Sequence, residues 1–350
     1  MFDLTALTGN PELWDHFSRA EEYAPELVDQ YGRFRSWMSR GPHPFEPVVS
    51  RTLVERFGRP TWPNGHTFSI CLTHDVDCIR YSIPKTGFET LVAARRGEFR
   101  SALSMAMSRL SRSRNPLWNF HDIMAMEERY AAQSSFFFLA LEPGDQDYNF
   151  RIGEVREVLH EVERRGWEVG LHGGHEAWIN LTTLRKEKDR IEHALGSPVV
   201  GYRNHYLRFA VPETWRSLAD IGFVYDTTFG WADQIGFRNG MCHPYQPYDR
   251  NAQEFVDIVE LPVVIMDRTF DRYLGVSDEK AFELSRVILD RTAELGGVAT
   301  IIWHNTDFVG SRRDLYERIL AYGREMNAWM PTARDIVTHW RDQSSGASTR

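Results

Sequence analysis

From residue 67 onward, short apolar runs alternate with segments of helical period. Seven alternations over about 270 residues predict a parallel sheet, and a closed or nearly closed (β/α) barrel fits that number better than a small open sheet. Several of the amphipathic segments end in glycine, as helices commonly do. The expected strands are TFSICLTHD, SSFFFLAL, WEVGLH, SPVVGYR, FVYDTT, VDIVELPVVIM and GGVATIIWHN.

The remaining segments flank or interrupt this pattern. Residues 1–65 are polar and predict a helical N-terminal extension, and the barrel is expected over 66–342. Residues 83–115 interrupt the alternation with seven basic residues against two acidic ones, and they predict a solvated, basic helical insertion. The alternative for this insertion is peripheral contact with an anionic membrane or a phosphate-bearing substrate. Residues 343–350 are expected to be a disordered tail.

Composition narrows the class of protein. With 42% hydrophobic and 26% charged residues the chain is an ordinary globular protein, and its net charge of −8 argues against a nucleic-acid partner. Three cysteines without a CxxC pair indicate neither a disulfide framework nor a structural zinc module. The N-terminus has no basic start followed by an apolar run, and no uncharged apolar stretch is long enough to span a membrane. These features predict a cytoplasmic protein.

Polar and metal-competent side chains follow the apolar strands at their carboxyl ends. In a (β/α) barrel these ends gather at one mouth, where such folds place their sites. Residues from distant parts of the sequence are therefore expected to form one cluster. The candidates are Asp75, Asp77, His172, His175, Glu176, Arg203, His205 and His304.

The two carboxylates of this set suggest a division of labour. Asp75 and Asp77 are two residues apart, so both can reach the same small volume at the end of a strand. One can bind a divalent metal while the other acts as a general base. Arg203 can hold a carboxylate such as Asp75 ionised through two hydrogen bonds. The alternative is an ordinary strand-end turn with a surface ion pair.

The histidines supply candidate metal ligands and a general acid. His172 directly follows an apolar strand, and the two glycines after it allow a bend that returns His175 or Glu176 to the same point. Imidazole and carboxylate ligands with an open position suit Zn²⁺, and also Co²⁺, Ni²⁺ or Fe²⁺. His205 is a further candidate ligand or substrate contact. His304 ends the last strong strand and is a candidate general acid.

Taken together, these motifs resemble those of a known family. LTHDVD, EVGLHGGHE, GYRNHYLR, DTTFGW with FRNGMCHPY, ELPVVIMD and IIWHN are similar, in this order, to those of polysaccharide deacetylase-like proteins, also called carbohydrate esterase family 4. The THDVD-type first motif resembles a divergent bacterial branch that is often linked to surface-polysaccharide synthesis. The resemblance runs from about residue 67 to 310, and the N-terminal extension and the basic insertion lie outside it.

The resemblance implies a distorted (β/α)7 barrel and metal-dependent removal of an N- or O-acetyl group from a sugar. It implies that Asp75 is the catalytic base, that Arg203 orients this base and that His304 is the general acid. Asp77 would be the metal-binding carboxylate, one position later than the family's usual adjacent pair.

The same resemblance implies histidine ligands for the metal. His172 matches the first histidine of the family's second motif. The second histidine of that motif falls four residues later, where this chain has Glu176, so the third ligand is expected among Glu176, His175 and His205. Zinc is the expected ion.

The expected substrate is therefore an acetylated sugar, N-acetylated and cytosolic, linked to a nucleotide or a lipid. Three alternatives remain: a related hydrolase that cleaves the C–N bond of a non-sugar amide, a non-catalytic carbohydrate-binding protein that keeps the barrel, and a scaffold that uses the basic insertion as its contact surface.

Overall fold

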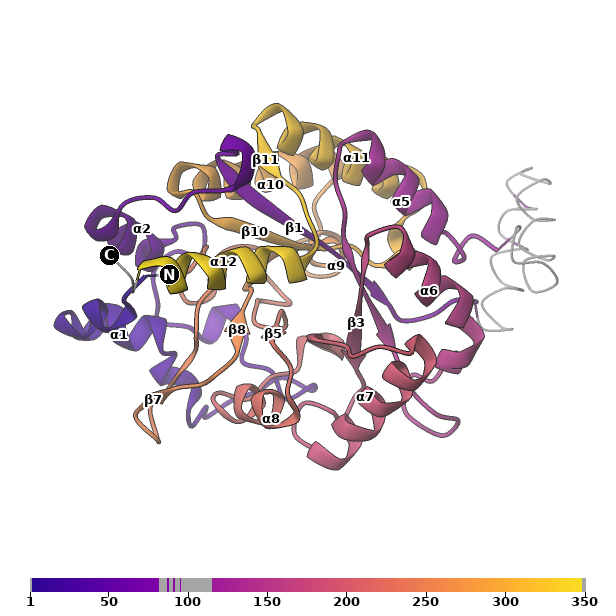
Figure 1. The fold of residues 1–350 in the computed structure, drawn as a ribbon, viewed down its shortest axis with the longest axis horizontal. Coiled ribbons are helices and arrows are strands. Elements are labelled where there is room, and N and C mark those ends of the chain that lie inside the picture. The colour runs from indigo at the N-terminus through magenta and orange to yellow at the C-terminus, as the bar shows by residue number, and fades with distance from the viewer. Residues whose placement is uncertain (1, 82–86, 88–90, 92–94, 96–114, 348–350) are drawn as a thin grey trace.

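A curved, parallel sheet forms the centre of the computed structural model, which describes residues 2–81, 87, 91, 95 and 115–347 (Figure 1). Its strand order is β8-β5-β4-β3-β2-β1-β10-β9, and β11 also pairs with β1. This sheet with its surrounding helices confirms the predicted distorted (β/α) barrel. The strands are β1 (Phe68–Val76), β2 (Ser135–Leu139), β3 (Glu168–Gly173), β4 (Gly201–Asn204), β5 (Tyr225–Asp226), β8 (Val259–Glu260), β9 (Val263–Met266), β10 (Val298–Ile302) and β11 (Ala328–Trp329).

The central strand β1 is buried along its whole length. It pairs with β10 from Ser69 opposite Val298 onward, and with β2 up to Val76 opposite Phe138. All pairings of this sheet are parallel, so the carboxyl ends of its strands face the same side of the barrel. This arrangement brings the strand-end residues of the sequence together.

Amphipathic helices cover the outside of the sheet (Figure 1). They bury their apolar faces against it, and Gly196 and Gly296 end two of them in the left-handed conformation, with φ of 83° and 67°. The outer helices are α5 (Phe120–Arg129), α6 (Arg156–Arg164), α7 (Leu181–Leu195), α8 (Glu213–Ile221), α10 (Asp278–Leu295) and α11 (Gly310–Glu325). Helix α9 (Asp267–Arg272) follows β9 at the barrel mouth, and α12 (Ala333–Ala347) crosses the barrel and packs against Cys71, Phe137 and Tyr225 (Figure 1).

Two strand glycines allow an aromatic ring of the next strand to lie across the backbone. A Cβ at Gly173 of β3 would overlap the hydroxyl of Tyr202 on β4, and a Cβ at Gly201 of β4 would overlap that of Tyr225 on β5. These close approaches fix the spacing of the strands that lead into the site.

The N-terminal extension contains α1 (Pro11–Phe17), α2 (Val48–Phe57) and several short 3-10 helices, and it packs against the barrel. Glu22 and Arg19 are buried together, with 2.7 Å between Oε1 and Nε. The same Glu22 accepts a hydrogen bond of 3.0 Å from Arg238, which lies between β5 and β8. Buried charges need such partners, so this contact joins extension and barrel closely.

The tail differs from its prediction. Helix α12 continues to Ala347, so residues 343–347 are helical and not disordered; Gln343 donates a hydrogen bond of 2.8 Å to the carbonyl oxygen of Thr61, which ties this part of the helix to the extension. The last three residues lie outside the described part of the chain. So does nearly all of the predicted basic insertion over 83–115. No helix among the described residues is long and apolar enough to cross a membrane.

Candidate active site and metal centre

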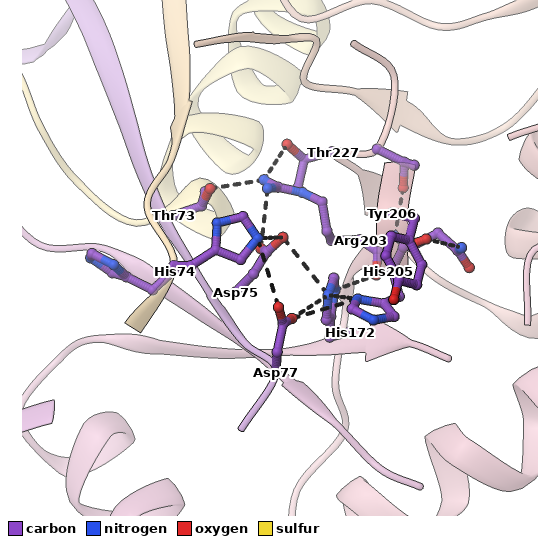
Figure 2. A network of polar contacts seen from close by, with 12 residues as sticks. Thr73, His74, Asp75, Asp77, His172, Arg203, His205, Tyr206 and Thr227 are labelled. Carbon is purple, nitrogen blue, oxygen red and sulfur yellow. Dashed lines mark hydrogen bonds and ion pairs between the residues drawn. The ribbon is translucent and has the colours of Figure 1, made fainter. Parts of the chain in front are cut away.

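Strand β1 presents its polar residues on two sides. Thr73 and Asp75 point into the barrel mouth, whereas His74 points away and contacts Glu127 at 2.8 Å (Figure 2). This alternation is the usual geometry of a strand. Asp77 follows the end of the strand and returns to the same side as Asp75. The two carboxylates therefore meet at the mouth, as their spacing predicts.

Arg203, at the end of β4, holds Asp75. Its Nη1 donates to Oδ1 of Asp75 at 3.2 Å, and its Nη2 donates to the hydroxyls of Thr73 and Thr227 at 2.8 and 3.0 Å. The contact predicted from sequence is thus present, but with one hydrogen bond to the carboxylate and the others to threonines. Burial raises the pKa of Asp75, but Arg203, His172 and His304 together outweigh it, and the pKa lies below its ordinary value. Asp75 is therefore held ionised.

Three potential metal ligands converge beside this pair. Oδ1 of Asp77 lies 3.3 Å from Nε2 of His172 and 3.5 Å from Nδ1 of His205, and the two histidine nitrogens are 3.1 Å apart. These are the distances of donor atoms that share one ion. Oδ1 of Asp77 is buried and, within the described residues, has no hydrogen-bond partner. A cation would satisfy it, so the donor set fits a divalent metal such as zinc.

The neighbours of these ligands orient them. Nδ1 of His172 lies 3.1 Å from the carbonyl oxygen of Arg203, which requires the proton on Nδ1 and leaves the lone pair of Nε2 directed at the cluster. Nε2 of His205 faces Asp147 at 3.5 Å. Burial is the main cause that lowers the pKa of His205, and a neutral imidazole is the form that binds metal.

A turn after β4 brings His205 into the cluster. The next residue, Tyr206, has a left-handed backbone with φ of 62°, which is unusual for a side chain of its size. Such a backbone costs on the order of 1 kcal/mol and is common at functional sites. Here it allows the chain to turn directly after the strand, so that the imidazole reaches Asp77.

The other two predicted ligands lie elsewhere. Nδ1 of His175 is 2.9 Å from Oε1 of Glu176, and the carbonyl oxygen of His175 accepts a hydrogen bond of 2.6 Å from Arg208. The side chain of Glu176 is 62% exposed. Neither residue belongs to the cluster of three donors, so of the three candidates for the third ligand the structure places only His205 there.

His304 lies at the opposite side of the same mouth. Its Nε2 is 3.9 Å from Oδ2 of both Asp75 and Asp77, and its Nδ1 is 2.7 Å from Oδ1 of Asp267. Burial and the nearby Arg268 lower the pKa of His304, but the carboxylates of Asp267 and Asp77 together outweigh them, so the pKa lies above its ordinary value. This favours a protonated imidazole that can donate from Nε2.

Sequence reasoning missed two functional candidates, Asp267 and Arg268. Nη1 of Arg268 pairs with Oδ2 of Asp77 at 2.7 Å and so leaves Oδ1 directed at the histidines. Burial raises the pKa of Asp77, but Arg268 and His205 hold it well below the ordinary value. A signal was present, because both residues directly follow the apolar strand VVIM, at the position that identified the other candidates.

A second group, Asp267, His304 and Asp307, also meets the spacing of metal ligands. Its carboxylates already have partners, since Asp267 binds His304 and Oδ2 of Asp307 lies 3.2 Å from Nε of Arg268. The cluster of Asp77, His172 and His205 is therefore the better metal centre.

The mouth contains a small, partly open cavity of about 40 Å³. Asp75, His205 and His304 line it from the barrel, and Arg33 lines it from the N-terminal extension. No spacing or period in the sequence connects Arg33 with the strand ends, so this contribution of the extension was unpredictable.

Comparison with known proteins finds similar folds among solved structures. No protein-family model matches the sequence, and no curated protein matches it. Among solved structures, the chain is similar to a candidate polysaccharide deacetylase from Mycobacterium smegmatis, with a TM-score of 0.57 and 21% identity over 82% of this chain and 94% of that one. A candidate polysaccharide deacetylase from Pseudomonas aeruginosa PAO1 gives a TM-score of 0.55 and 16% identity over 91% and 98%.

A third similar structure is Puue allantoinase, with a TM-score of 0.55 and 15% identity over 90% of this chain and 98% of that one. These likenesses show that the chain has the fold of polysaccharide deacetylases. They support the resemblance that the sequence motifs indicate.

Proposed function

We propose that this protein is a metal-dependent hydrolase that removes an acetyl group, N-linked in the first instance, from a sugar. The observation that carries the proposal is the buried Oδ1 of Asp77, which has no hydrogen-bond partner among the described residues and lies within 3.5 Å of nitrogens of His172 and His205. This three-donor cluster lies beside the carboxylate of Asp75 and the imidazole of His304, whose Nε2 is 3.9 Å from Oδ2 of both Asp75 and Asp77. The arrangement provides a base, an acid and a metal position at one mouth.

Asp77, His172 and His205 would hold the ion, and zinc suits them best, with cobalt, nickel or iron as other fits. A divalent ion at this position supplies Lewis-acid polarisation of the acetamide carbonyl and a lower pKa for attacking water. Arg268 binds the outer oxygen of Asp77 and keeps its inner oxygen in place.

Asp75 acts as the general base. It is ionised and its orientation is fixed by Arg203, so its free Oδ2, 3.8 Å from Nε2 of His172, is available to take a proton from water.

His304 acts as the general acid. An amine is a poor leaving group, and the tetrahedral intermediate would revert to the amide unless the nitrogen gains a proton as the C–N bond breaks. Nε2 of His304 faces the mouth and can deliver this proton. Asp267 accepts a hydrogen bond from Nδ1–H of His304. This contact keeps the imidazole protonated and directs its Nε2–H toward the mouth.

Acetylated sugars are the proposed substrates because two of the similar structures are candidate polysaccharide deacetylases. A cytoplasmic, nucleotide- or lipid-linked sugar, with membrane contact through residues 83–115, extends this proposal on the grounds of the sequence. A second candidate is hydrolysis of a small non-sugar amide. The cavity of about 40 Å³ favours it, since ligand pockets of drug-sized molecules are roughly 300–1,000 Å³.

Metal content and acetate release together test the proposal. We expect about one metal ion per wild-type chain, none in Asp77→Ala or His172→Ala, and acetate release from N-acetylated sugars that depends on added Zn²⁺ or Co²⁺. Release from small amides alone would favour the second candidate. A protein that binds saccharides but no metal, and releases no acetate, would contradict the hydrolase and indicate a carbohydrate-binding protein.

A further inference from the structure

A segment of the N-terminal extension, Asp29–Arg35, crosses the mouth, and we call it the mouth strap. The carboxylate of Asp29 organises it. This carboxylate accepts hydrogen bonds from the backbone nitrogens of Tyr31 and Arg33, at 2.8 and 3.0 Å, and from the side chains of Arg33 and Arg35, at 2.9 and 3.0 Å. Four hydrogen bonds to one charged group make the strap a defined element.

The mouth strap bridges two sides of the barrel. Nη1 of Arg33 donates to the carbonyl oxygen of Tyr206 at 2.7 Å, and Nη2 donates to the hydroxyl of Tyr273 at 3.1 Å. Tyr206 follows β4, and Tyr273 follows α9, the helix directly after β9. Strands β4 and β9 are far apart in the strand order. Tyr31 also stacks on Tyr206, with ring centroids 4.6 Å apart. Arg33 is only 5% exposed and lines the cavity between these contacts, so the strap covers this part of the mouth.

The covered mouth restricts what can enter. Its cavity of about 40 Å³ exceeds the roughly 10–15 Å³ that one water needs, but it is far smaller than an ordinary ligand pocket. An acetyl group fits this space. The interior of a polysaccharide chain would have to lie across the strap, so the geometry favours a group presented at the end of a small molecule.

The charges around the cavity further restrict which substrates can bind. Three arginines line it: Arg33, Arg268 and Arg272. Arg33 is paired with Asp29, and Arg268 with Asp77 and Asp307. The guanidinium of Arg272, on α9, has no hydrogen bond or ion pair within the part of the chain that the structure describes. Arg272 is an exposed residue that lines the cavity, so it offers an unpaired positive charge at the rim of the mouth.

We propose that the substrate is a small acylated molecule that carries a phosphate or carboxylate. Arg272 binds this anion, and the mouth strap excludes the interior of polymers. A guanidinium matches both anions in charge and in its two parallel donors. The inference rests on the proposed function for the acyl group, but the recognition of the anion is independent of turnover.

Binding of a product-like probe tests the role of Arg272. Glucosamine 1-phosphate has no acetyl group to lose, so its affinity for the metal-loaded full chain can be measured by calorimetry against that of glucosamine. We expect at least tenfold tighter binding of the phosphate, with most of this difference lost in Arg272→Gln. Arg164→Gln is the matched control, because Arg164 is an exposed arginine at the far end of α6.

Further probes identify the source of any anion binding. Glucuronate beside glucose shows whether a carboxylate is accepted as well as a phosphate. Equal affinities for glucosamine and its phosphate, or a phosphate preference that Arg272→Gln leaves intact, would overturn the proposal. A preference lost in Asp77→Ala but kept in Arg272→Gln would show that phosphate binds the metal and would overturn it too.

Acetate release from a chitin-type pentamer and from N-acetylglucosamine 1-phosphate tests the mouth strap. The wild-type chain should release acetate faster from the sugar phosphate than from the pentamer. Arg33→Ala should raise the rate on the pentamer relative to the rate on the sugar phosphate, and mass spectrometry should locate the new deacetylation at the interior sugars of the pentamer. Unchanged metal content and a single cooperative melting transition show that Arg33→Ala is folded, with Arg164→Ala as control. Efficient wild-type cleavage inside the pentamer would overturn this part. If no substrate releases acetate, the proposed function fails, while the calorimetry still decides the anion site.

Discussion

Asp267 holds His304 at two points: Oδ1 lies 2.7 Å from the imidazole Nδ1, and Oδ2 accepts the backbone N–H of His304 at 2.7 Å. The two residues belong to neighbouring strands, since Asp267 follows β9 and His304 follows β10. This double contact fixes the imidazole relative to the sheet and directs Nε2 toward the mouth.

Replacing Asp267 by asparagine should impair proton donation. An amide can donate to Nδ1 of His304 and so favour the wrong tautomer, and we expect kcat for acetate release to fall about 100-fold or more. The alkaline limb of the pH profile should move to lower pH, because Asp267 acts to raise the pKa of His304. Metal content should not change. Asp271→Asn, four residues later on the same helix and half exposed, is the control; an equal loss in that variant would argue against the assigned role.

The third ligand can be identified by comparing His205→Ala with His175→Ala. We expect the first variant to lose at least tenfold in metal affinity, because Nδ1 of His205 belongs to the donor cluster. The second should retain the wild-type affinity, since His175 is paired with Glu176 outside the cluster. Equilibrium dialysis with Zn²⁺ measures both. The reverse order of affinities would refute the ligand set.

Arg203→Lys should lower the stability of the fold and weaken the control of Asp75 as the general base. A lysine cannot donate simultaneously to Asp75, Thr73 and Thr227, so buried acceptors lose partners, and the free energy of unfolding should fall by about 1–3 kcal/mol. The pKa of Asp75 should rise toward its ordinary value, which moves the acidic limb of kcat/KM to higher pH. Denaturant unfolding and pH profiles check these effects. Arg165→Lys, at a surface ion pair with Glu128, should change neither.

His243 should make the protein less stable in acid. Burial lowers its pKa to about 3. Its Nε2 lies 3.2 Å from the carbonyl oxygen of Leu295 and its Nδ1 2.8 Å from Ser50 Oγ, which itself accepts the Cys242 N–H. The neutral ring is thus fully satisfied.

Below the ordinary histidine pKa of 6.5, the unfolded chain takes up a proton that the folded chain does not. The free energy of unfolding should therefore fall as the pH drops from about 6.5 toward 3, by up to about 1.4 kcal/mol per pH unit for this one group. His16, with a pKa of about 4, acts in the same direction. The free energy of unfolding of His243→Gln should lie below that of the wild type by less at pH 4.5 than at pH 7. A deficit that is constant with pH would contradict this assignment.

Gly173→Ala tests the close approach of β3 and β4. The added methyl would overlap the hydroxyl of Tyr202, which also bonds to Asn204, so ring and strand would have to shift. We expect a loss of about 1–3 kcal/mol in the free energy of unfolding. Because Gly173 follows His172, metal affinity should fall as well. Gly153→Ala has open space around it and should stay within about 0.5 kcal/mol of wild type; similar losses in both variants would contradict the packing argument.

The period of apolar residues sufficed to predict the barrel and the main group at its mouth. Asp75, Asp77, His172, Arg203 and His304 each end or follow a buried strand, and parallel pairing forces such ends together. The sequence could not choose between His175, Glu176 and His205. That choice depends on the left-handed turn at Tyr206, which no short-range pattern of side chains indicates.

Long-range contacts limited the prediction in the same way. Asp267 and Arg268 follow a strand whose apolar run was visible, so the strand-end rule could have found them. Arg33 could not be found, because its partners Tyr206 and Tyr273 are 173 and 240 residues away. A contact of this kind is set by how the extension docks, which local propensity does not encode.

The buried charges that join extension and barrel bear on how the protein folds. Glu22 binds both Arg19 and Arg238, and all three side chains are almost completely buried. Detaching the extension would leave Arg238 inside the barrel without its carboxylate, which is among the most costly single losses a folded protein can suffer. The extension and the barrel should therefore unfold in one cooperative transition, and a fragment that begins at residue 66 would lack part of its own interior.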